Sequence, residues 1–201
     1  MSVAPVDYYF EFSSPYGYIA SHLVDGLGAR IGREIRWRPF LLGPVFKATG
    51  TAPLVDIPMK GDYSRRDFVR SARFHGVTFN MPEKFPIGTV GAVRAFYWIG
   101  DQDPAKARAF ARALYNEYFA GGRDIGAPET VIEVAASLGV DRNALQAALA
   151  DSAVKERAKA EVDAAIAKGV FGSPFFIVDG EPFWGCDRIP MLEQWVKRGG
   201  W

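Results

Sequence analysis

The chain has 201 residues, a formal net charge of +1 and 49% hydrophobic residues. This length can bury one good core, or one core with an inserted subdomain. The near-neutral charge argues against nucleic acid and against an anionic membrane surface, because both select proteins with a strong basic bias. We find neither a secretory signal nor the apolar run of about 18 residues that a membrane span needs, and we therefore expect a cytoplasmic protein.

Cysteine and histidine usage excludes two kinds of chemistry. The single cysteine, Cys186, rules out an intramolecular disulfide and a Cys-x-x-Cys redox centre. The two histidines, His22 and His75, lie far apart without a carboxylate cluster at ligand spacing, so we expect no metal site.

The N-terminal segment predicts a strand, a helix and a second strand, over residues 6–12, 16–31 and 35–40. Such a unit places its two strands in parallel. Ser14-Pro15 stands at the start of the helix, where serine is a favoured N-cap and the missing N–H of proline costs nothing. The plain interpretation of Ser14 is a cap. The positive end of the helix dipole would also stabilise an anion there, such as a thiolate.

Residues 41–168 contain no convincing strand and predict several helices. The expected helices cover residues 60–74, 89–100, 105–120, 127–139, a segment capped by Asp141, and 152–168. Asp103-Pro104 is a good start for the helix over 105–120.

The strand signal returns near the C-terminus. Residues 175–178 and 182–184 predict a hairpin around Asp179-Gly180, and residues 187–197 predict a final helix that Asp187 caps. Trp184 is interpreted as a core residue of this hairpin. Ser173-Pro174 opens the first arm, where proline cannot donate to a sheet, and we predict a cis peptide bond. An ordinary strand-initiating proline is the alternative.

These elements predict an α/β protein with a thioredoxin-like fold and a large all-α insertion between a βαβ half and a ββα half. The thioredoxin-like domain would comprise residues 1–42 and 169–201, and the inserted helical domain residues 43–168. Two consecutive domains fit poorly, because neither β half could bury a sheet alone.

Three motifs resemble a known family when taken together: Phe-Glu-Phe-Ser-Ser-Pro-Tyr at 10–16, Gly-Val-Phe-Gly-Ser-Pro-Phe-Phe at 169–176, and Phe-Trp-Gly-Cys-Asp-Arg at 183–188. The chain resembles the 2-hydroxychromene-2-carboxylate isomerases, glutathione-dependent enzymes of bacterial naphthalene breakdown and close relatives of kappa-class glutathione transferases. That family shares the thioredoxin fold with a helical insertion seen in periplasmic disulfide oxidoreductases. Disulfide exchange itself is excluded, because Ser14 and Gly17 stand where the two redox cysteines would be.

The resemblance implies glutathione as a cofactor and a small aromatic carboxylate as substrate. Ser14 would hold the glutathione sulfur as a thiolate. The remaining glutathione contacts would come from Ser173, Pro174, Trp184, Gly185, Cys186 and Asp187, with the Asp187 carboxylate receiving the γ-glutamyl ammonium. The organic substrate would lie toward Phe46, Lys47, Thr51 and Phe85. The family also implies a homodimer.

Several alternatives stay open. Lys47 has the equally plain interpretation of a solvated helix lysine, and Cys186 that of a small packed residue. Relatives often carry asparagine where this chain has Thr51 and Gly88, a departure that touches the substrate side more than the glutathione side. The alternative functions are a kappa-like transferase that releases a glutathione conjugate, and a non-catalytic module that binds a thiol or peptide.

Overall fold

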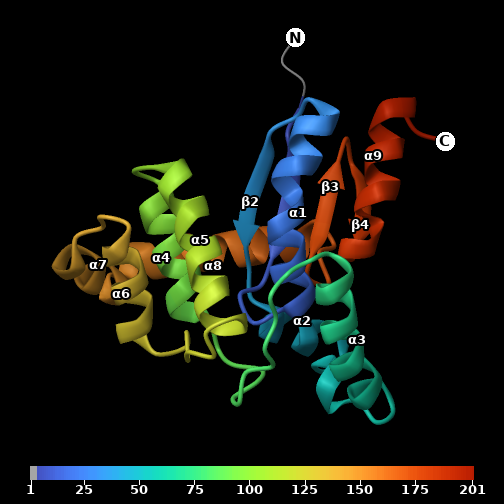
Figure 1. Cartoon of the computed structure of the whole chain (residues 1–201). Coiled ribbons are helices and arrows are strands. Elements are labelled where there is room, and N and C mark those ends of the chain that lie inside the picture. The colour runs from blue at the N-terminus through green and yellow to red at the C-terminus, as the bar shows by residue number, and fades with distance from the viewer. Residues whose placement is uncertain (1–3) are drawn as a thin grey trace.

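The computed structural model describes residues 4–201, so the first three residues of the predicted thioredoxin-like domain lie outside it (Figure 1). In chain order the elements are β1 (Val6–Phe10), α1 (Pro15–Ile31), β2 (Ile35–Pro39), α2 (Leu42–Thr49), the 3₁₀ turn η1 (Leu54–Asp56), α3 (Lys60–Phe74), α4 (Val90–Gly100), α5 (Pro104–Phe119), α6 (Pro128–Ser137), α7 (Arg142–Ala150), α8 (Ser152–Ala167), β3 (Phe175–Val178), β4 (Glu181–Trp184), the 3₁₀ turn η2 (Cys186–Arg188) and α9 (Ile189–Arg198).

The four strands form one sheet in the order β2-β1-β3-β4. β1 pairs with β2 in parallel and with β3 antiparallel, so the two ends of the chain meet in the middle of the sheet. β3 and β4 form the predicted antiparallel hairpin. This arrangement confirms the thioredoxin-like fold, with α2 to α8 between the two halves in sequence. The division into two domains at residues 42 and 168 stays a prediction.

β1 is buried on both faces because an apolar cluster packs against each side of the sheet. On one face Tyr8 and Phe10 stack on each other and pack against Trp37 of β2 and Phe176 of β3, with the Tyr8 ring 5.2 Å from that of Phe176. On the other face Tyr9 lies in a second apolar cluster with α2 and α8. Burial on both faces explains the nearly continuous aromatic run that predicted this strand.

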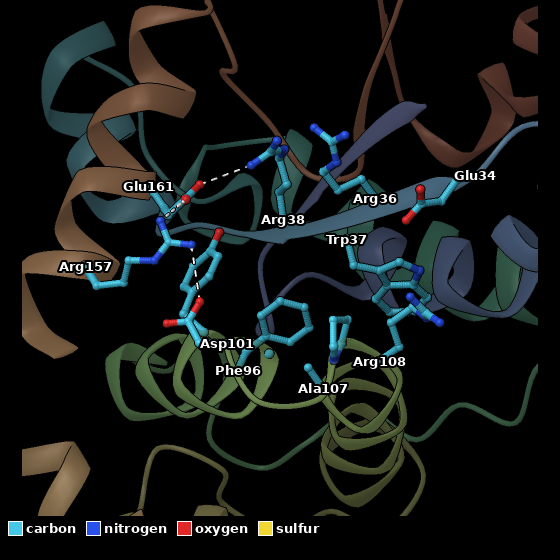
Figure 2. Close-up of a pocket in the computed structure, with 13 residues that line it drawn as sticks. Glu34, Arg36, Trp37, Arg38, Phe96, Asp101, Ala107, Arg108, Arg157 and Glu161 are labelled. Carbon is cyan, nitrogen blue, oxygen red and sulfur yellow. Dashed lines mark hydrogen bonds and ion pairs between the residues drawn. The ribbon is translucent and has the colours of Figure 1, made fainter. Parts of the chain in front are cut away.

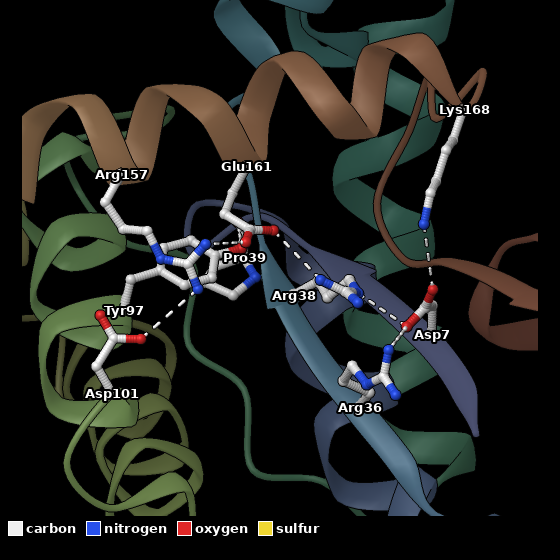
Figure 3. Close-up of polar contacts among 9 residues, drawn as sticks. All are labelled: Asp7, Arg36, Arg38, Pro39, Tyr97, Asp101, Arg157, Glu161 and Lys168. Atoms are coloured by element: carbon white, nitrogen blue, oxygen red, sulfur yellow. Dashed lines mark hydrogen bonds and ion pairs between the residues drawn. The ribbon is translucent and has the colours of Figure 1, made fainter. Parts of the chain in front are cut away.

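Charged side chains tie the helical insertion to the sheet (Figure 3). The guanidinium of Arg38 on β2 contacts Asp7 of β1 at 2.8 Å and Glu161 of α8 at 3.2 Å. Glu161 also accepts from Arg157 at 2.5 Å, and the hydroxyl of Tyr97 on α4 donates to the Pro39 carbonyl at 2.8 Å. The insertion is therefore fixed to the β2 edge by directional contacts as well as by apolar packing.

Most helix boundaries agree with the sequence prediction, and the caps at Ser14, Asp103 and Asp141 all accept a hydrogen bond from their helix. Three boundaries are wrong by two residues. The helix predicted over residues 127–139 ends at Ser137. The first strand ends at Phe10 rather than at residue 12, and Glu11 begins the loop that precedes α1. The last helix begins at Ile189 rather than at 187, because the 3₁₀ turn η2 comes first.

No helix among residues 4–201 combines the length and the apolar character needed to cross a bilayer.

Candidate active site

Ser14 lies where β1 leads into α1, and it is 93% buried, with 7% of its surface exposed. Its backbone is extended, and its Oγ accepts a hydrogen bond from the N–H of Gly17 at 3.0 Å. Pro15 occupies the first turn as predicted. Helix geometry leaves the N–H of Tyr16 without an acceptor inside α1, so the positive end of the helix opens beside the Ser14 hydroxyl.

The Ser173-Pro174 loop lies directly against Ser14. The Ser14 hydroxyl donates to the Ser173 carbonyl at 3.0 Å, and the N–H of Glu11 donates to Ser173 Oγ at 2.9 Å. The Ser173-Pro174 peptide bond is cis, as the sequence predicted, and so is Phe85-Pro86, which was not predicted. The structure thus brings together two predicted site residues that lie 159 residues apart in the chain.

Trp184 is half exposed, so its interpretation as a hairpin core residue is wrong; Phe183 faces the core in its place. The Trp184 indole lies over Gly172, where an added Cβ would stand 2.3 Å from the indole nitrogen. The exposed ring of Phe171 lies beside it, with the ring centres 4.9 Å apart. An exposed aromatic surface therefore borders the Ser173-Pro174 loop.

Gly185, Cys186 and Asp187 follow this aromatic surface. The N–H of Gly185 donates to the Pro174 carbonyl at 3.0 Å, which fixes the segment to the cis-proline loop. Gly185 has φ of 111°, and an added Cβ would stand 2.3 Å from an Asp187 carboxylate oxygen, so this position requires glycine.

Asp187 does not cap the last helix, which corrects the sequence interpretation. It lies inside η2, while Arg188 occupies the position before α9. Its carboxylate accepts from the Arg188 guanidinium at 3.0 Å and is 68% exposed. It is therefore free to meet a bound group.

Cys186 is buried, and burial followed by the charge of Asp187 raises the pKa of its thiol to about 11. A thiol held neutral in this way is a poor nucleophile, so the structure favours the packed role.

Aromatic side chains form the opposite border of the site. Tyr16 in the first turn of α1 packs against Phe68 of α3 with ring centres 5.0 Å apart, and Phe68 packs against Phe85 at 6.1 Å. The Tyr16 hydroxyl donates to Asp67 of α3 at 2.5 Å. Phe85 is therefore linked by ring contacts to the helix that Ser14 begins, whereas no motif in the sequence indicated Phe68 or Asp67.

The other predicted substrate residues lie on a separate segment. Phe46 and Lys47 are on α2, and Thr51 follows it with its hydroxyl 2.8 Å from that of Thr49. β1 and β2 are parallel, so α2 leaves the same edge of the sheet at which α1 begins, and Figure 1 shows both at that end. No hydrogen bond joins these three residues to Ser14 in the part of the chain that the structure describes. Gly88 has open space where a Cβ would be, so the asparagine of relatives would fit there.

Glu11 is a buried carboxyl group that the sequence interpretation missed. One carboxylate oxygen accepts from the N–H of Ser13 at 2.7 Å, and the other accepts from the hydroxyl of Thr89. Burial raises the pKa of Glu11 to about 7, although these two hydrogen bonds act in the opposite direction. A lone acid in an aromatic run was the only signal in the sequence.

A cavity lies away from Ser14, between β2, α4, α5 and α8 (Figure 2). It has a volume of about 180 Å³, and arginine and acidic side chains line much of it. None of the predicted site residues borders it. We therefore assign the chemistry from the groups at Ser14 rather than from this cavity.

The fold and the Ser14 site together define a thioredoxin-fold protein with serine in place of the reactive cysteine. The chain belongs to the family described as the DsbA-like thioredoxin domain, whose model matches residues 5–197.

Within that family the chain is similar to isomerases and transferases. It is 31% identical to the 2-hydroxychromene-2-carboxylate isomerase of Pseudomonas putida over 195 residues, which is 96% of this chain and 94% of that protein. A solved 2-hydroxychromene-2-carboxylate isomerase structure superposes with a TM-score of 0.87 at 31% identity, covering 97% of this chain and 95% of the other. The glutathione S-transferase kappa 2 of Caenorhabditis elegans is 28% identical over 204 residues, covering 95% and 91%. These matches confirm the resemblance and identify the relatives as enzymes.

The raised pKa of Glu11 predicts a specific pH dependence of stability. Its pKa is about 7 in the folded protein against 4.5 for an ordinary glutamate, so the folded state holds the proton more tightly. The stabilisation is fully present below about pH 4.5 and is lost as the pH rises through 7. Glu11→Gln removes this titration. The free energy of unfolding of the variant, measured relative to that of the wild type, should therefore rise by on the order of 3 kcal/mol as the pH increases from about 4.5 to about 7.

Urea unfolding at about pH 5 and about pH 8 measures this difference. Glu156→Gln on α8 replaces an exposed glutamate and is the matched control. If the free energies of unfolding of Glu11→Gln and the wild type differed by the same amount at both pH values, a pKa of Glu11 near 7 would be contradicted.

Proposed function

We propose that this protein is a glutathione-dependent isomerase that interconverts 2-hydroxychromene-2-carboxylate and trans-o-hydroxybenzylidenepyruvate. The observation that carries the proposal is the Ser14 hydroxyl at the N-terminus of α1, 3.0 Å from the backbone of the Ser173-Pro174 loop. This arrangement offers a thiolate a hydroxyl donor and a helix N-terminus together. The name and full-length similarity of the Pseudomonas putida relative support the choice of reaction.

The groups at Ser14 suffice to favour a thiolate. An ordinary thiol has a pKa of about 8.5, and each unit of lowering corresponds to about 1.36 kcal/mol. The Ser14 hydroxyl donates to the neutral Ser173 carbonyl, so holding sulfur would exchange a neutral hydrogen bond for a charge-assisted one. That exchange is worth about 1–1.5 kcal/mol, and the helix end adds about 0.3–1 kcal/mol. The sum lowers the thiol pKa by one to two units, to about 7.

The residues around Ser14 fit the rest of glutathione. The N–H of Ser173 makes no hydrogen bond within residues 4–201 and would serve the cysteinyl part. The exposed Asp187 carboxylate would receive the γ-glutamyl ammonium, and the Trp184 ring would cover the chain between them. Glutathione supplies the nucleophilic sulfur when bound, and the protein's own groups bind and orient it.

In the proposed reaction the ring C–O bond of the cyclic substrate breaks, and the proton of its hydroxyl passes to the phenolic oxygen, which leaves a ketone conjugated to a cis double bond. Bound glutathione would supply a sulfur nucleophile that adds reversibly to this double bond, so that the carbons can rotate and the trans isomer is released with glutathione unchanged. Ser14 would hold the sulfur, and Lys47 is proposed to attract the substrate carboxylate.

A cytoplasmic location and a homodimer are parts of the same proposal. Thiols are kept reduced in the cytosol by glutathione, so the proposed cofactor is abundant there. The homodimer rests on the family resemblance, and sedimentation analysis of the purified protein measures it.

A kappa-class transferase is the second candidate, because the Caenorhabditis elegans kappa 2 enzyme covers 95% of this chain at 28% identity. A transferase consumes glutathione and releases a conjugate, whereas the isomerase returns it. The two functions therefore differ in the glutathione balance.

The direct test is to incubate the protein with 2-hydroxychromene-2-carboxylate in the presence and absence of glutathione. We expect the ultraviolet spectrum to change toward the benzylidenepyruvate only when glutathione is present, with the amount of free thiol unchanged at the end. Loss of thiol in proportion to product would favour the transferase. No spectral change with glutathione present would contradict the proposed reaction.

Ser14→Ala should leave the fold intact and lower turnover by about an order of magnitude or more. The reason is the lost charge-assisted hydrogen bond of roughly 1.5–3 kcal/mol, since 1.36 kcal/mol is tenfold in rate. Steady-state kinetics and circular dichroism on the same preparation check both parts. Ser152→Ala at the exposed start of α8 is the control. Full activity in Ser14→Ala would refute the thiolate role.

Asp187→Asn should weaken glutathione binding without a loss of stability. Asp187 caps no helix, so the substitution removes only the ion pair with the exposed Arg188. Binding should fall because a charge-assisted hydrogen bond becomes a neutral one of about half the strength. Calorimetric titration and thermal unfolding measure the two effects. Unchanged affinity would remove Asp187 from the glutathione site.

A further inference from the structure

The Glu11 side chain connects two segments that border the Ser14 site from different parts of the chain. Its carboxylate accepts from the N–H of Ser13, one residue before Ser14, at 2.7 Å. The other oxygen accepts from the hydroxyl of Thr89, the residue that precedes α4. Ser13 Oγ in turn accepts from the N–H of Ile87 at 3.1 Å. Residues 87–89 therefore donate two hydrogen bonds to the loop before α1, one to the Glu11 carboxylate and one to the Ser13 hydroxyl.

The backbone of the same residue makes three more of the contacts that fix the site. Its N–H donates to Ser173 Oγ at 2.9 Å, and its carbonyl accepts from the N–H of Ser14 at 2.9 Å. The carbonyl also accepts from the hydroxyl of Tyr115 on α5 at 2.8 Å. A shift of Glu11 would therefore move Ser14 and the Ser173 loop together.

The carboxylate faces hydroxyl and amide groups rather than a cation. Thr89 faces it from the start of α4, Ser13 from its own loop, and the tyrosine hydroxyls of Tyr115 and Tyr118 lie nearby on α5. No lysine, arginine or histidine of residues 4–201 lies within ion-pair distance of Glu11. The ionised group is held by donors alone, and at 6% exposure it is poorly solvated.

We propose that Glu11 is a positioning residue for Ser14: its carboxylate holds the Glu11–Ser14 loop against the start of α4 and so fixes the direction of the Ser14 hydroxyl. The inference rests on the proposed function, because it concerns the geometry in which that hydroxyl meets glutathione. Glu11 itself touches neither the proposed cofactor nor the substrate.

Protonation of Glu11 should change the hydrogen bonds of its carboxylate in a defined way. The ionised carboxylate accepts from both donors, whereas a neutral acid carries its own O–H and accepts at fewer positions. The Ser13 N–H can only donate, but the Thr89 hydroxyl can turn and accept. The Thr89 contact is therefore the one that changes when Glu11 takes up a proton. Glu11→Gln reproduces the neutral state, because its amide has one acceptor and one donor group.

The test measures the protonation of the Glu11 carboxylate and its effect on the Ser14 site separately. The chemical shift of the Ser13 amide, measured by nuclear magnetic resonance across pH, reports on the carboxylate without any ligand. Binding of S-methylglutathione reports on the site without a titrating thiol.

In the wild type we expect the Ser13 amide to titrate with a midpoint near pH 7, where burial sets the pKa of Glu11. S-methylglutathione should bind about threefold to tenfold more weakly below this midpoint, corresponding to the exchange of one charge-assisted hydrogen bond for a neutral one. Glu11→Gln should show no such titration and should bind weakly at every pH.

Two substitutions at Thr89 sharpen the test. Thr89→Val removes a donor that lowers the pKa of Glu11, so the midpoint should move to higher pH. Thr89→Ser keeps the hydroxyl and should keep the midpoint. Thr130→Val, at a buried threonine in α6, is the matched control for loss of a hydroxyl and should also leave it unchanged.

Different outcomes would overturn different statements. S-methylglutathione affinity that is independent of pH in the wild type, or unchanged in Glu11→Gln, would overturn the positioning role. An unchanged midpoint of the Ser13 amide titration in Thr89→Val would overturn the inference that the Thr89 hydroxyl stabilises the ionised Glu11 carboxylate. If neither glutathione nor its S-methyl derivative bound the wild type at any pH, the proposed function would fail together with the role inferred for Glu11, although the Ser13 amide would still report its titration.

Discussion

The candidate site depends on the hydrogen bonds that join the end of β1 to the loop before β3. Glu11 donates its N–H to Ser173 Oγ and Ser14 donates its hydroxyl to the Ser173 carbonyl, across 162 and 159 residues of sequence. These contacts are buried, so an unmade bond would leave a desolvated polar group at a cost of about 1–3 kcal/mol. They become possible because β1 and β3 are neighbours, with Tyr9 opposite Phe175. The sheet therefore has to form before the site exists.

The features that could be predicted from the sequence are those decided by local chemistry. Ser14-Pro15, Asp103-Pro104 and Asp141 are caps because a side-chain oxygen next to a helix start satisfies N–H groups that have no other acceptor. The βαβ and ββα halves followed from strand patterns, and the meeting of Ser14 with Ser173 followed from the fold that those halves imply. The resemblance to the family rested on these two segments and on the motif at residues 183–188.

The errors arose where tertiary position decides. Trp184 is on β4, an edge strand, and successive side chains of a strand face opposite sides. Since Phe183 is buried, Trp184 has to point outward. Asp187 was taken for a cap because it precedes an amphipathic run, but Arg188 has helical backbone angles and the 3₁₀ turn continues into α9 without an extended capping residue. Glu11 was missed because its partner Thr89 lies 78 residues away in the insertion.

The position of Thr89 shows how the two parts of the chain share the site. The thioredoxin-like halves supply Ser14, Ser173 and Asp187, the groups proposed to hold glutathione. The helical insertion supplies Phe85, Phe68 and the residues of α2, which border the space proposed for the organic substrate. An insertion bound only by apolar packing could shift relative to the sheet by small amounts. Here the Arg38–Glu161 ion pair fixes it at the β2 edge, and the Glu11–Thr89 hydrogen bond fixes it beside Ser14. A substitution within the insertion can therefore reshape the proposed substrate space while Ser14 and Ser173 keep their positions, provided that these two attachments are kept.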